Sequence, residues 1–390
     1  MERAAAGRGA TALEPDATLS LPEPARQPYG LNAFDDPRAT ATLAAVARLL
    51  QDQVHHLAEL WRGMRSGAAP EVLAQDLPVW LDGLLHRGGK RLRPAMCHWG
   101  YVAAGGQMGS ARHAELVRAA TALELLHQFA LLHDDVMDES DWRRGEPAAH
   151  RQAERWHAAA SARGDKAAFG RNLAVLLGDL ALVQAERLVG TLSPPLRDLW
   201  YELCVELVLG QCGDLTGAAA GRRDRQYAER LAELKSGCYT VVRPLAMGAT
   251  AAGAGAAAHS ALRSYGIHAG AAFALRDEVL GMWGDPAFTG KPVGDDLRAG
   301  KPTVLLSLAV ERLDGAAAET LGRAGESPMP ASDVIALRDA MAAAGLRDEM
   351  EALIGSQVGH ALDAVRNEAL HPAGIAGLVD LTLALAWRAS

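Results

Sequence analysis

The chain has 390 residues, 49% of them hydrophobic, and a formal net charge of −8. This length suits one large domain with a sizeable core, and the negative charge argues against a broad nucleic-acid-binding surface. The four cysteines include no CxxC pair. They are therefore expected to be thiols in a reducing compartment rather than a disulfide framework.

Residues 1–36 are rich in Ala, Pro and charged residues, and they are predicted to form a disordered arm. The arm contains no apolar segment typical of a secretory signal, and its acidic residues argue against a transit peptide. No later stretch is long and apolar enough to span a membrane. These features predict a cytoplasmic protein with no membrane span and no nucleic-acid partner.

Residues 37–390 are predicted to form one all-α domain, because Ala and Leu are strong helix formers and no run alternates apolar with polar residues. Proline in a first turn, as at Pro94 and Pro194, supports several helix starts. The loops near 105, at 140–148 and at 284–300 combine Gly, Pro and charge. The predicted helices span residues 39–65, 70–86, 92–104, 109–138, 166–191, 195–219, 226–258, 260–283, 302–323, 331–344, 347–369 and 372–388.

A first acidic segment, HDDVMD, ends the predicted helix 109–138. Asp134 and Asp138 are four residues apart and lie on one helical face, with Asp135 about 100° round the helix. Such carboxylates repel each other unless a cation lies between them, and Mg²⁺ commonly bridges carboxylates to phosphates. The segment predicts a Mg²⁺ site at these three residues, and a solvated helix end is the alternative.

Cationic residues flank this segment on both sides. Arg143 and Arg144 follow it, and paired guanidiniums suit a diphosphate. Upstream, residues 88–94 (GGKRLRP) bring three cations to a predicted helix start, where flexible backbone and the helix N-terminus favour an anion. Solvated arginines are the alternative for both groups.

A second acidic segment, FALRDEVLG, covers residues 273–281. Asp277 is predicted to bind a further metal ion opposite the first segment. Lys291 and Lys301 in the polar region that follows are candidates to meet phosphate. Lys235 lies between the two acidic segments, and a solvated lysine is the alternative there.

The motifs GGKRLRP, DDVMD followed by RRG, KSGCYT and GKPVGDDLRAGK occur here in the order found in one family. In this combination, over residues 40–390, the chain resembles the trans-polyprenyl diphosphate synthases. The resemblance implies a helical fold around a deep central cavity, usually in a homodimer. It also implies that isopentenyl diphosphate and allylic prenyl diphosphates are the substrates.

By this resemblance Asp134 and Asp138 bind Mg²⁺ and the allylic diphosphate, and Asp277 binds a further Mg²⁺. Lys235 joins these three as a candidate for catalysis. The residues that match the isopentenyl diphosphate site are Lys90, Arg93, His127 and Arg144. Those that match the allylic site are Arg143, Lys235, Ser236, Lys291 and Lys301, with Ser236 in place of the usual Thr. Metal and cations then stabilise the diphosphate leaving group, while an apolar pocket protects the carbocation from water.

The second acidic motif departs from the family pattern. Ala274 replaces the usual Gln, Glu278 replaces the second Asp, and Gly281 stands where a third carboxylate is common. A working but unusual site is expected.

Product length depends on the floor of the pocket below the first acidic segment. Phe129, five residues before Asp134, resembles the aromatic floor of enzymes that make short products, and Ala130 beside it leaves some room. This favours a C20 product, geranylgeranyl diphosphate, over C15. The alternative is that Phe129 is ordinary core.

Three other functions are considered. A class I terpene cyclase on the same fold needs no isopentenyl diphosphate, but the four residues that match the isopentenyl site argue against it. A non-catalytic regulatory subunit of a prenyl synthase is suggested by the weakened second motif and opposed by the intact first one. A metallophosphohydrolase of the HD type is suggested only by His133 with Asp134, since further His ligands are not found at matching positions.

Overall fold

The structure, a computed structural model, describes residues 35–65, 72–87, 89–286, 293–326 and 329–388. Apart from a short hairpin, β1 (Trp142–Arg143) and β2 (Glu146–Pro147), this part of the chain is helical, which confirms the all-α prediction. The helices are α2 (Pro37–Met64), α3 (Leu77–His86), α4 (Leu92–Ala103), α5 (Ala111–Met137), α6 (Ala149–Ala159), α7 (Lys166–Val189), α8 (Pro194–Ala219), α9 (Arg225–Ala232), the π-helix η1 (Glu233–Val242), α10 (Arg243–Ala252), α11 (Ala256–Trp283), α13 (Asp295–Arg298), α14 (Val304–Arg312), α15 (Gly315–Gly322), α16 (Ala331–Ala343), α17 (Leu346–Ala364) and α18 (Pro372–Ala386).

Side-chain caps explain several helix starts. Asp36, Ser110 and Thr303 each accept a hydrogen bond from a backbone N–H two or three residues further on, at the starts of α2, α5 and α14. Pro194 occupies the first position of α8, where its missing N–H costs little. The long helices around the site therefore begin within a few residues of their predicted starts.

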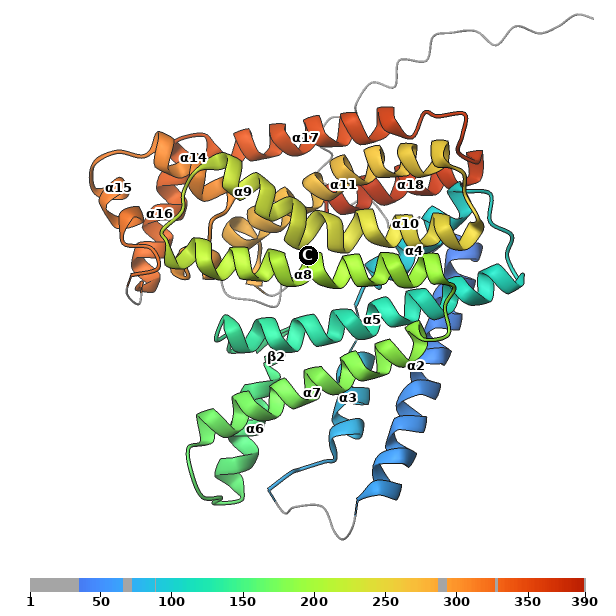
Figure 1. Cartoon of the computed structure of the whole chain (residues 1–390). Coiled ribbons are helices and arrows are strands. Elements are labelled where there is room, and N and C mark those ends of the chain that lie inside the picture. The colour runs from blue at the N-terminus through green and yellow to red at the C-terminus, as the bar shows by residue number, and fades with distance from the viewer. Residues whose placement is uncertain (1–34, 66–71, 88, 287–292, 327–328, 389–390) are drawn as a thin grey trace, which may run out of the picture.

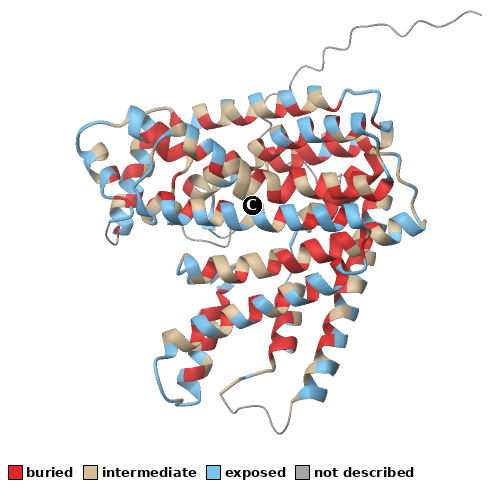
Figure 2. Ribbon diagram, viewed as in Figure 1, coloured by how far each residue is buried: buried red, intermediate tan, exposed pale blue. Residues whose placement is uncertain are grey.

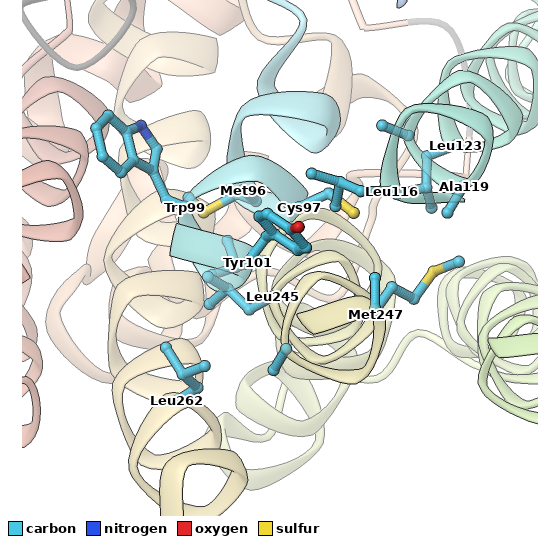
Figure 3. Close-up of a cluster of buried hydrophobic side chains, with 14 of the residues drawn as sticks. Met96, Cys97, Trp99, Tyr101, Leu116, Ala119, Leu123, Leu245, Met247 and Leu262 are labelled. Carbon is cyan, nitrogen blue, oxygen red and sulfur yellow. The ribbon is translucent and has the colours of Figure 1, made fainter. Parts of the chain in front are cut away.

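Helix α5 runs through the middle of the molecule, between α8 and α7 (Figure 1). It packs along α7, while α11 packs along α17 and η1. The largest apolar core includes the crossing of α4 and α10, where Gly100 meets the backbone of Leu245 and Gly248 meets that of Cys97. Trp99 and Tyr101 of α4 lie in this core (Figure 3), and buried residues line the helix contacts (Figure 2).

Two helix predictions were wrong, and one helix was missed. Helix α6 was not predicted at all. The span predicted as one helix over 226–258 is divided into α9, η1 and α10, and it ends at Gly253, whose φ is 81°. The span 302–323 is divided into α14 and α15, because Leu313 and Asp314 between them are extended.

Almost all of the N-terminal arm predicted over residues 1–36 lies outside the described residues, and so does Lys291. Within the described ranges, no helix is long and apolar enough to cross a membrane.

Candidate active site

The first acidic segment ends α5, and lysines from two other parts of the chain reach it. The Nζ of Lys301 lies 2.5 Å from Asp138 Oδ2, and the Nζ of Lys235 lies 3.4 Å from Asp134 Oδ1. Burial, and after it the charge of Asp134, raises the pKa of Asp138 against the lowering effect of Lys301. The two carboxylates therefore act on each other, as their spacing predicts.

Asp214 of α8 joins these residues, although sequence reasoning gave it no role. It is 4% exposed and forms ion pairs with Lys235 and, at 3.4 Å, with Lys301. Burial lowers the pKa of Lys301, but the carboxylates around it hold that pKa above its ordinary value, so the lysine stays cationic. We call Asp134, Asp138, Asp214, Lys235 and Lys301 the lysine–aspartate cluster.

Lys235 lies on the π-helix η1. This helix packs closely against α8 and α11, because each of them has a glycine at the contact. A Cβ added to Gly210 of α8 would lie 3.1 Å from Lys235 Cα, and one added to Gly270 of α11 would lie 2.8 Å from Gly237 Cα. The wide turns of a π-helix are frequent at functional sites. Ser236 follows Lys235 in η1 and is half-buried.

The hairpin after α5 carries Arg143 and Arg144. The turn residues Arg144 and Gly145 have φ of 54° and 75°, as a two-residue type I′ turn requires. The Nε of Arg143 donates to Asp135 at 2.8 Å, and its Nη2 lies 3.6 Å from Asp134. Asp135 is 3% exposed, so the carboxylate predicted to bind metal is engaged by Arg143 in this structure.

In the second acidic segment, Asp277 is 51% exposed and forms an ion pair with Arg388. The Arg388 guanidinium lies 4.3 Å from the centre of the Phe273 ring. Ala274, which stands where the family pattern has Gln, is buried. The end of α11 therefore presents one exposed carboxylate beside a cation from the end of the chain.

Glu278, next to Asp277, contacts α14. Its two carboxylate oxygens accept hydrogen bonds from the backbone N–H groups of Val304, at 3.2 Å, and Leu305, at 2.8 Å. Burial raises the pKa of Glu278 to about 8, and these two donors oppose the rise. The longer side chain that replaces the usual Asp thus caps the start of α14.

Gly281 leaves room near the same helix end. A Cβ added there would lie 3.7 Å from Asp296 Oδ2, and Asp296 Oδ1 lies 3.9 Å from Lys301 Nζ. Lys301 therefore lies between the end of α5 and the end of α11.

A second group of cations surrounds Glu124 of α5. Arg91 Nη1 lies 3.7 Å from Glu124 Oε2. Burial raises the pKa of Glu124, and the charges of Arg91, Arg93 and Arg144 lower it. A Cβ on Gly89 would lie 3.0 Å from Arg144 Nη2, so glycine allows this close approach. Arg91, Arg93 and Arg144 form what we call the arginine cluster. Lys90, next to Arg91 in sequence, is exposed, and the charges of Arg388 and Asp277 act on it. Sequence reasoning counted Arg91 only among the three cations of the GGKRLRP motif, and it gave Glu124 no role.

Arg93 and His127 meet at Tyr239 of η1. The Arg93 guanidinium lies 4.1 Å from the centre of the Tyr239 ring, and the Tyr239 hydroxyl lies 3.3 Å from His127 Nδ1. Burial, and then the charges of Arg93 and Arg144, hold the pKa of His127 well below its ordinary value, so the imidazole is neutral. Arg91 Nη1 and Arg93 Nε are buried and have no hydrogen-bond partner among the described residues. These donors suit an anion.

The carboxylates fit Mg²⁺ that is bound together with phosphate. Among the described residues, no three His, Cys, Asp or Glu side chains gather as a site built from protein ligands alone. Mg²⁺ usually takes one or two carboxylates and completes its shell with water and substrate phosphates. Asp134 and Asp138 supply that number of hard oxygen donors, and the lysines beside them can meet the same phosphates.

Phe129 and Ala130 lie on α5 below the acidic end. Both are half-buried and pack against the apolar core. The Phe129 ring centre is 4.4 Å from that of His133, whose Nε2 lies 3.1 Å from the carbonyl oxygen of Val175 in α7. His133 is thus directed at α7, which does not favour the phosphohydrolase alternative.

A sequence profile of the polyprenyl synthetase family matches residues 76–337. The chain belongs to this family. The geranylgeranyl diphosphate synthase of Mycobacterium tuberculosis is 35% identical over 259 residues, which are 63% of this chain and 66% of that protein. The geranylfarnesyl diphosphate synthase of Aeropyrum pernix is 34% identical over 238 residues (59% and 69%), and a (2E,6E)-farnesyl diphosphate synthase of Mycobacterium bovis is 35% identical over 229 residues (57% of each). Two of these three relatives are thus matched over less than two thirds of their length.

Solved structures of polyprenyl synthetases share the fold. A geranylgeranyl pyrophosphate synthase from Corynebacterium glutamicum, complexed with isoprenyl diphosphate and magnesium, has a TM-score of 0.81 and 32% identity, covering 90% of this chain and 98% of that one. A polyprenyl synthase from Caulobacter crescentus, complexed with calcium and isoprenyl diphosphate, has a TM-score of 0.76 and 26% identity, covering 94% and 100%.

Proposed function

We propose that this chain condenses isopentenyl diphosphate with an allylic diphosphate to give a short-chain prenyl diphosphate. The observation that carries the proposal is the presence of two cationic groups at different positions along α5: the lysine–aspartate cluster at its acidic end, and the arginine cluster around Glu124, ten residues before Asp134. A condensation needs two diphosphate sites, whereas a cyclisation needs one. The arginine cluster therefore favours a prenyltransferase over a terpene cyclase.

In the proposed reaction the allylic diphosphate binds at the lysine–aspartate cluster. The residues assigned to it are Arg143, Lys235, Ser236, Lys291 and Lys301, and those assigned to Mg²⁺ are Asp134, Asp138 and Asp277. Bound Mg²⁺ supplies charge neutralisation for the diphosphate. The allylic C–O bond breaks with its electron pair leaving on the diphosphate, and the lysines stabilise that developing charge.

Isopentenyl diphosphate binds at the arginine cluster together with Lys90 and neutral His127. Its alkene forms the new C–C bond to the allylic cation, and the proton then lost goes to the departing diphosphate. The apolar side chains on α5 and α7 below the acidic end exclude water from the cation.

For the product we propose geranylgeranyl diphosphate. The relatives are named for farnesyl, geranylgeranyl and geranylfarnesyl products, so the product must be argued from this chain. Phe129 stands about 7.5 Å along the helix from Asp134, at a rise of about 1.5 Å per residue. A ring at that depth supports a short product, and Ala130 supports C20 over C15.

We propose a homodimer that forms through α7 and α8. Large apolar side chains are exposed at helical spacing on α7, at Leu176 and Val183, and on α8, at Tyr201, Val205, Val208 and Leu209. Exposed apolar rows of this kind mark interaction surfaces. Replacing Val208 with Glu should convert a dimer to monomer by sedimentation, and a wild-type chain that sediments as a monomer would contradict the proposal.

The function is tested by product analysis. The full chain is incubated with Mg²⁺, isopentenyl diphosphate and each of the C5, C10 and C15 allylic primers. C20 product that depends on isopentenyl diphosphate supports the proposal. Cyclic hydrocarbon from a primer alone would identify a cyclase, and no turnover with any primer would favour the regulatory subunit.

A further inference from the structure

Glu124 is the one carboxylate that the structure shows inside the arginine cluster. Its side chain is 13% exposed and that of Arg91 is 23% exposed. The 3.7 Å between Oε2 and Arg91 Nη1 is within ion-pair reach but too long for a hydrogen bond. The charges of Arg93 and Arg144 also act on Glu124, so this carboxylate faces three guanidiniums.

The backbone of Arg91 points to a role for its side chain. Arg91 precedes the first turn of α4 with φ of 43°, a left-handed conformation that favours Gly or Asn. Arg144, across the cluster, has φ of 54°. Strained backbone of this kind persists where the surroundings hold it, and it concentrates at binding sites. Two of the four non-glycine residues with positive φ in the described chain therefore carry guanidiniums of this cluster.

The hydrogen bonding of the cluster is incomplete in a way that suits a ligand. Arg91 Nη1 and Arg93 Nε are buried donors without a hydrogen-bond partner among the described residues. An unpaired buried donor is costly unless something binds it. Glu124 lies close enough to attract Arg91 by charge and too far to occupy that donor.

We propose that Arg91 binds the diphosphate of isopentenyl diphosphate and that Glu124 is a positioning residue, which holds Arg91, Arg93 and Arg144 together for that anion. This inference rests on the proposed condensation. Three guanidiniums in one cluster repel each other, and a fixed negative charge among them offsets that repulsion before substrate arrives. Without it, the guanidiniums separate and the site has to reassemble on binding.

The test is steady-state kinetics of the full chain with each substrate varied in turn. Glu124→Gln keeps the shape of the side chain and removes its charge. It should raise KM for isopentenyl diphosphate about tenfold, the size of one charged hydrogen bond, and leave kcat and KM for the allylic primer unchanged. Arg91→Gln should raise the same KM by at least as much. Glu124→Asp, which keeps the charge, should restore most of the affinity.

The pair should also be coupled. If Glu124 acts through Arg91, the double variant should be little worse than Arg91→Gln alone, whereas independent residues give effects that add. Glu349→Gln is the matched control, because it removes a carboxylate that binds Arg312 elsewhere on the molecule. That control should leave both KM values unchanged.

The outcomes separate two failures. If the unchanged protein makes no product that depends on isopentenyl diphosphate, the proposed function is wrong. If it is active but Glu124→Gln and Arg91→Gln keep its KM values, the inference alone is wrong. A lower KM for isopentenyl diphosphate in Glu124→Gln would show that Glu124 competes with substrate. Equal rises in the KM values of both substrates would show that Glu124 only supports the packing of the protein. Either result overturns the positioning role. If Glu124→Gln loses helix content by circular dichroism, Arg91→Gln and Glu124→Asp decide by the same criteria.

Discussion

The two acidic helix ends use their carboxylates differently. At the end of α5, Asp134 and Asp138 both lie beside lysines from other parts of the chain. At the end of α11, Asp277 is exposed beside Arg388, while its neighbour Glu278 caps α14. Two segments that look alike in sequence thus differ in structure. The carboxylates of the first pair with lysines, whereas those of the second are divided between an exposed ion pair and the packing of the next helix.

The difference follows from what each helix end meets. The end of α5 meets cations from η1, from the hairpin and from Lys301, which compensate two carboxylates that oppose the helix dipole. The end of α11 meets the N-terminus of α14, whose free N–H groups attract a carboxylate. Sequence similarity between acidic segments therefore does not fix how many of their carboxylates face a metal ion.

The largest expected effect concerns the three carboxylates that are proposed to bind Mg²⁺ at the two helix ends. Replacing Asp134, Asp138 or Asp277 with Ala should each lower kcat on the order of a hundredfold, because each loses about 3 kcal/mol of electrostatic stabilisation. Helix content by circular dichroism should stay unchanged. A folded Asp134→Ala or Asp138→Ala protein with nearly full turnover would refute the metal assignment at α5.

A second comparison uses the phenylalanines before the two acidic ends. Phe129→Ala should open the pocket below Asp134 and give products at least one isoprene unit longer from the same primers. Its cost in stability should be below the roughly 3–5 kcal/mol of a fully buried Phe, since Phe129 is half-buried. Chain length is measured by product chromatography.

Phe273→Ala is the matched control on α11, because Phe273 lies under Arg388 rather than below the α5 carboxylates. It should leave product length unchanged. If both variants lengthen the product equally, or if neither does, Phe129 is ordinary core and the preference for C20 loses its main support.

The parts of the fold that the sequence predicted are those whose signals are local. Helix α5 has an N-cap at Ser110 and ends in its acidic motif, so both of its ends were predicted to within two residues. Helix α6 was missed because it is polar, lacks a side-chain cap and is held by tertiary contacts, such as the Trp80 and Trp156 rings 4.4 Å apart. The π-helix η1 depends on close packing against Gly210 and Gly270, which no local period reveals.

The candidate site also contains residues with a local sequence signal and residues without one. The motif residues of the two clusters were predicted, and the structure brings Lys235 and Lys301 to the α5 carboxylates. Asp214 and Glu124 were not assigned, because a single acidic residue inside a helix acquires its role only from cations on other elements. The cap formed by Glu278 could not be predicted, since it requires the start of α14 to lie beside α11.

A smaller effect is expected at the cap that Glu278 forms at the start of α14. Glu278→Ala should lower the free energy of unfolding by about 1–2 kcal/mol, because the N–H groups of Val304 and Leu305 lose their acceptor. Its kcat should fall far less than that of Asp277→Ala. Urea unfolding measures the first quantity, and Glu311→Ala, at an exposed position of α14, is the control. Equal losses of kcat at positions 277 and 278 would show that both carboxylates serve the site.

The smallest effect concerns Gly281, one turn beyond Asp277 on the same face of α11. Gly281→Asp should place a further carboxylate near Asp296, since an added Cβ there has room at 3.7 Å from Asp296 Oδ2. Without a cation the two carboxylates repel each other, whereas Mg²⁺ gains an oxygen donor. The Mg²⁺ concentration for half-maximal turnover should therefore fall about threefold, or about 0.7 kcal/mol, while kcat at saturating Mg²⁺ is unchanged. Gly281→Asn has the same shape without the charge and should leave the Mg²⁺ requirement as it was. An equal shift in both variants would show that the loss of glycine, which stiffens the helix, causes the effect. The absence of a third carboxylate at position 281 would then have no influence on metal binding.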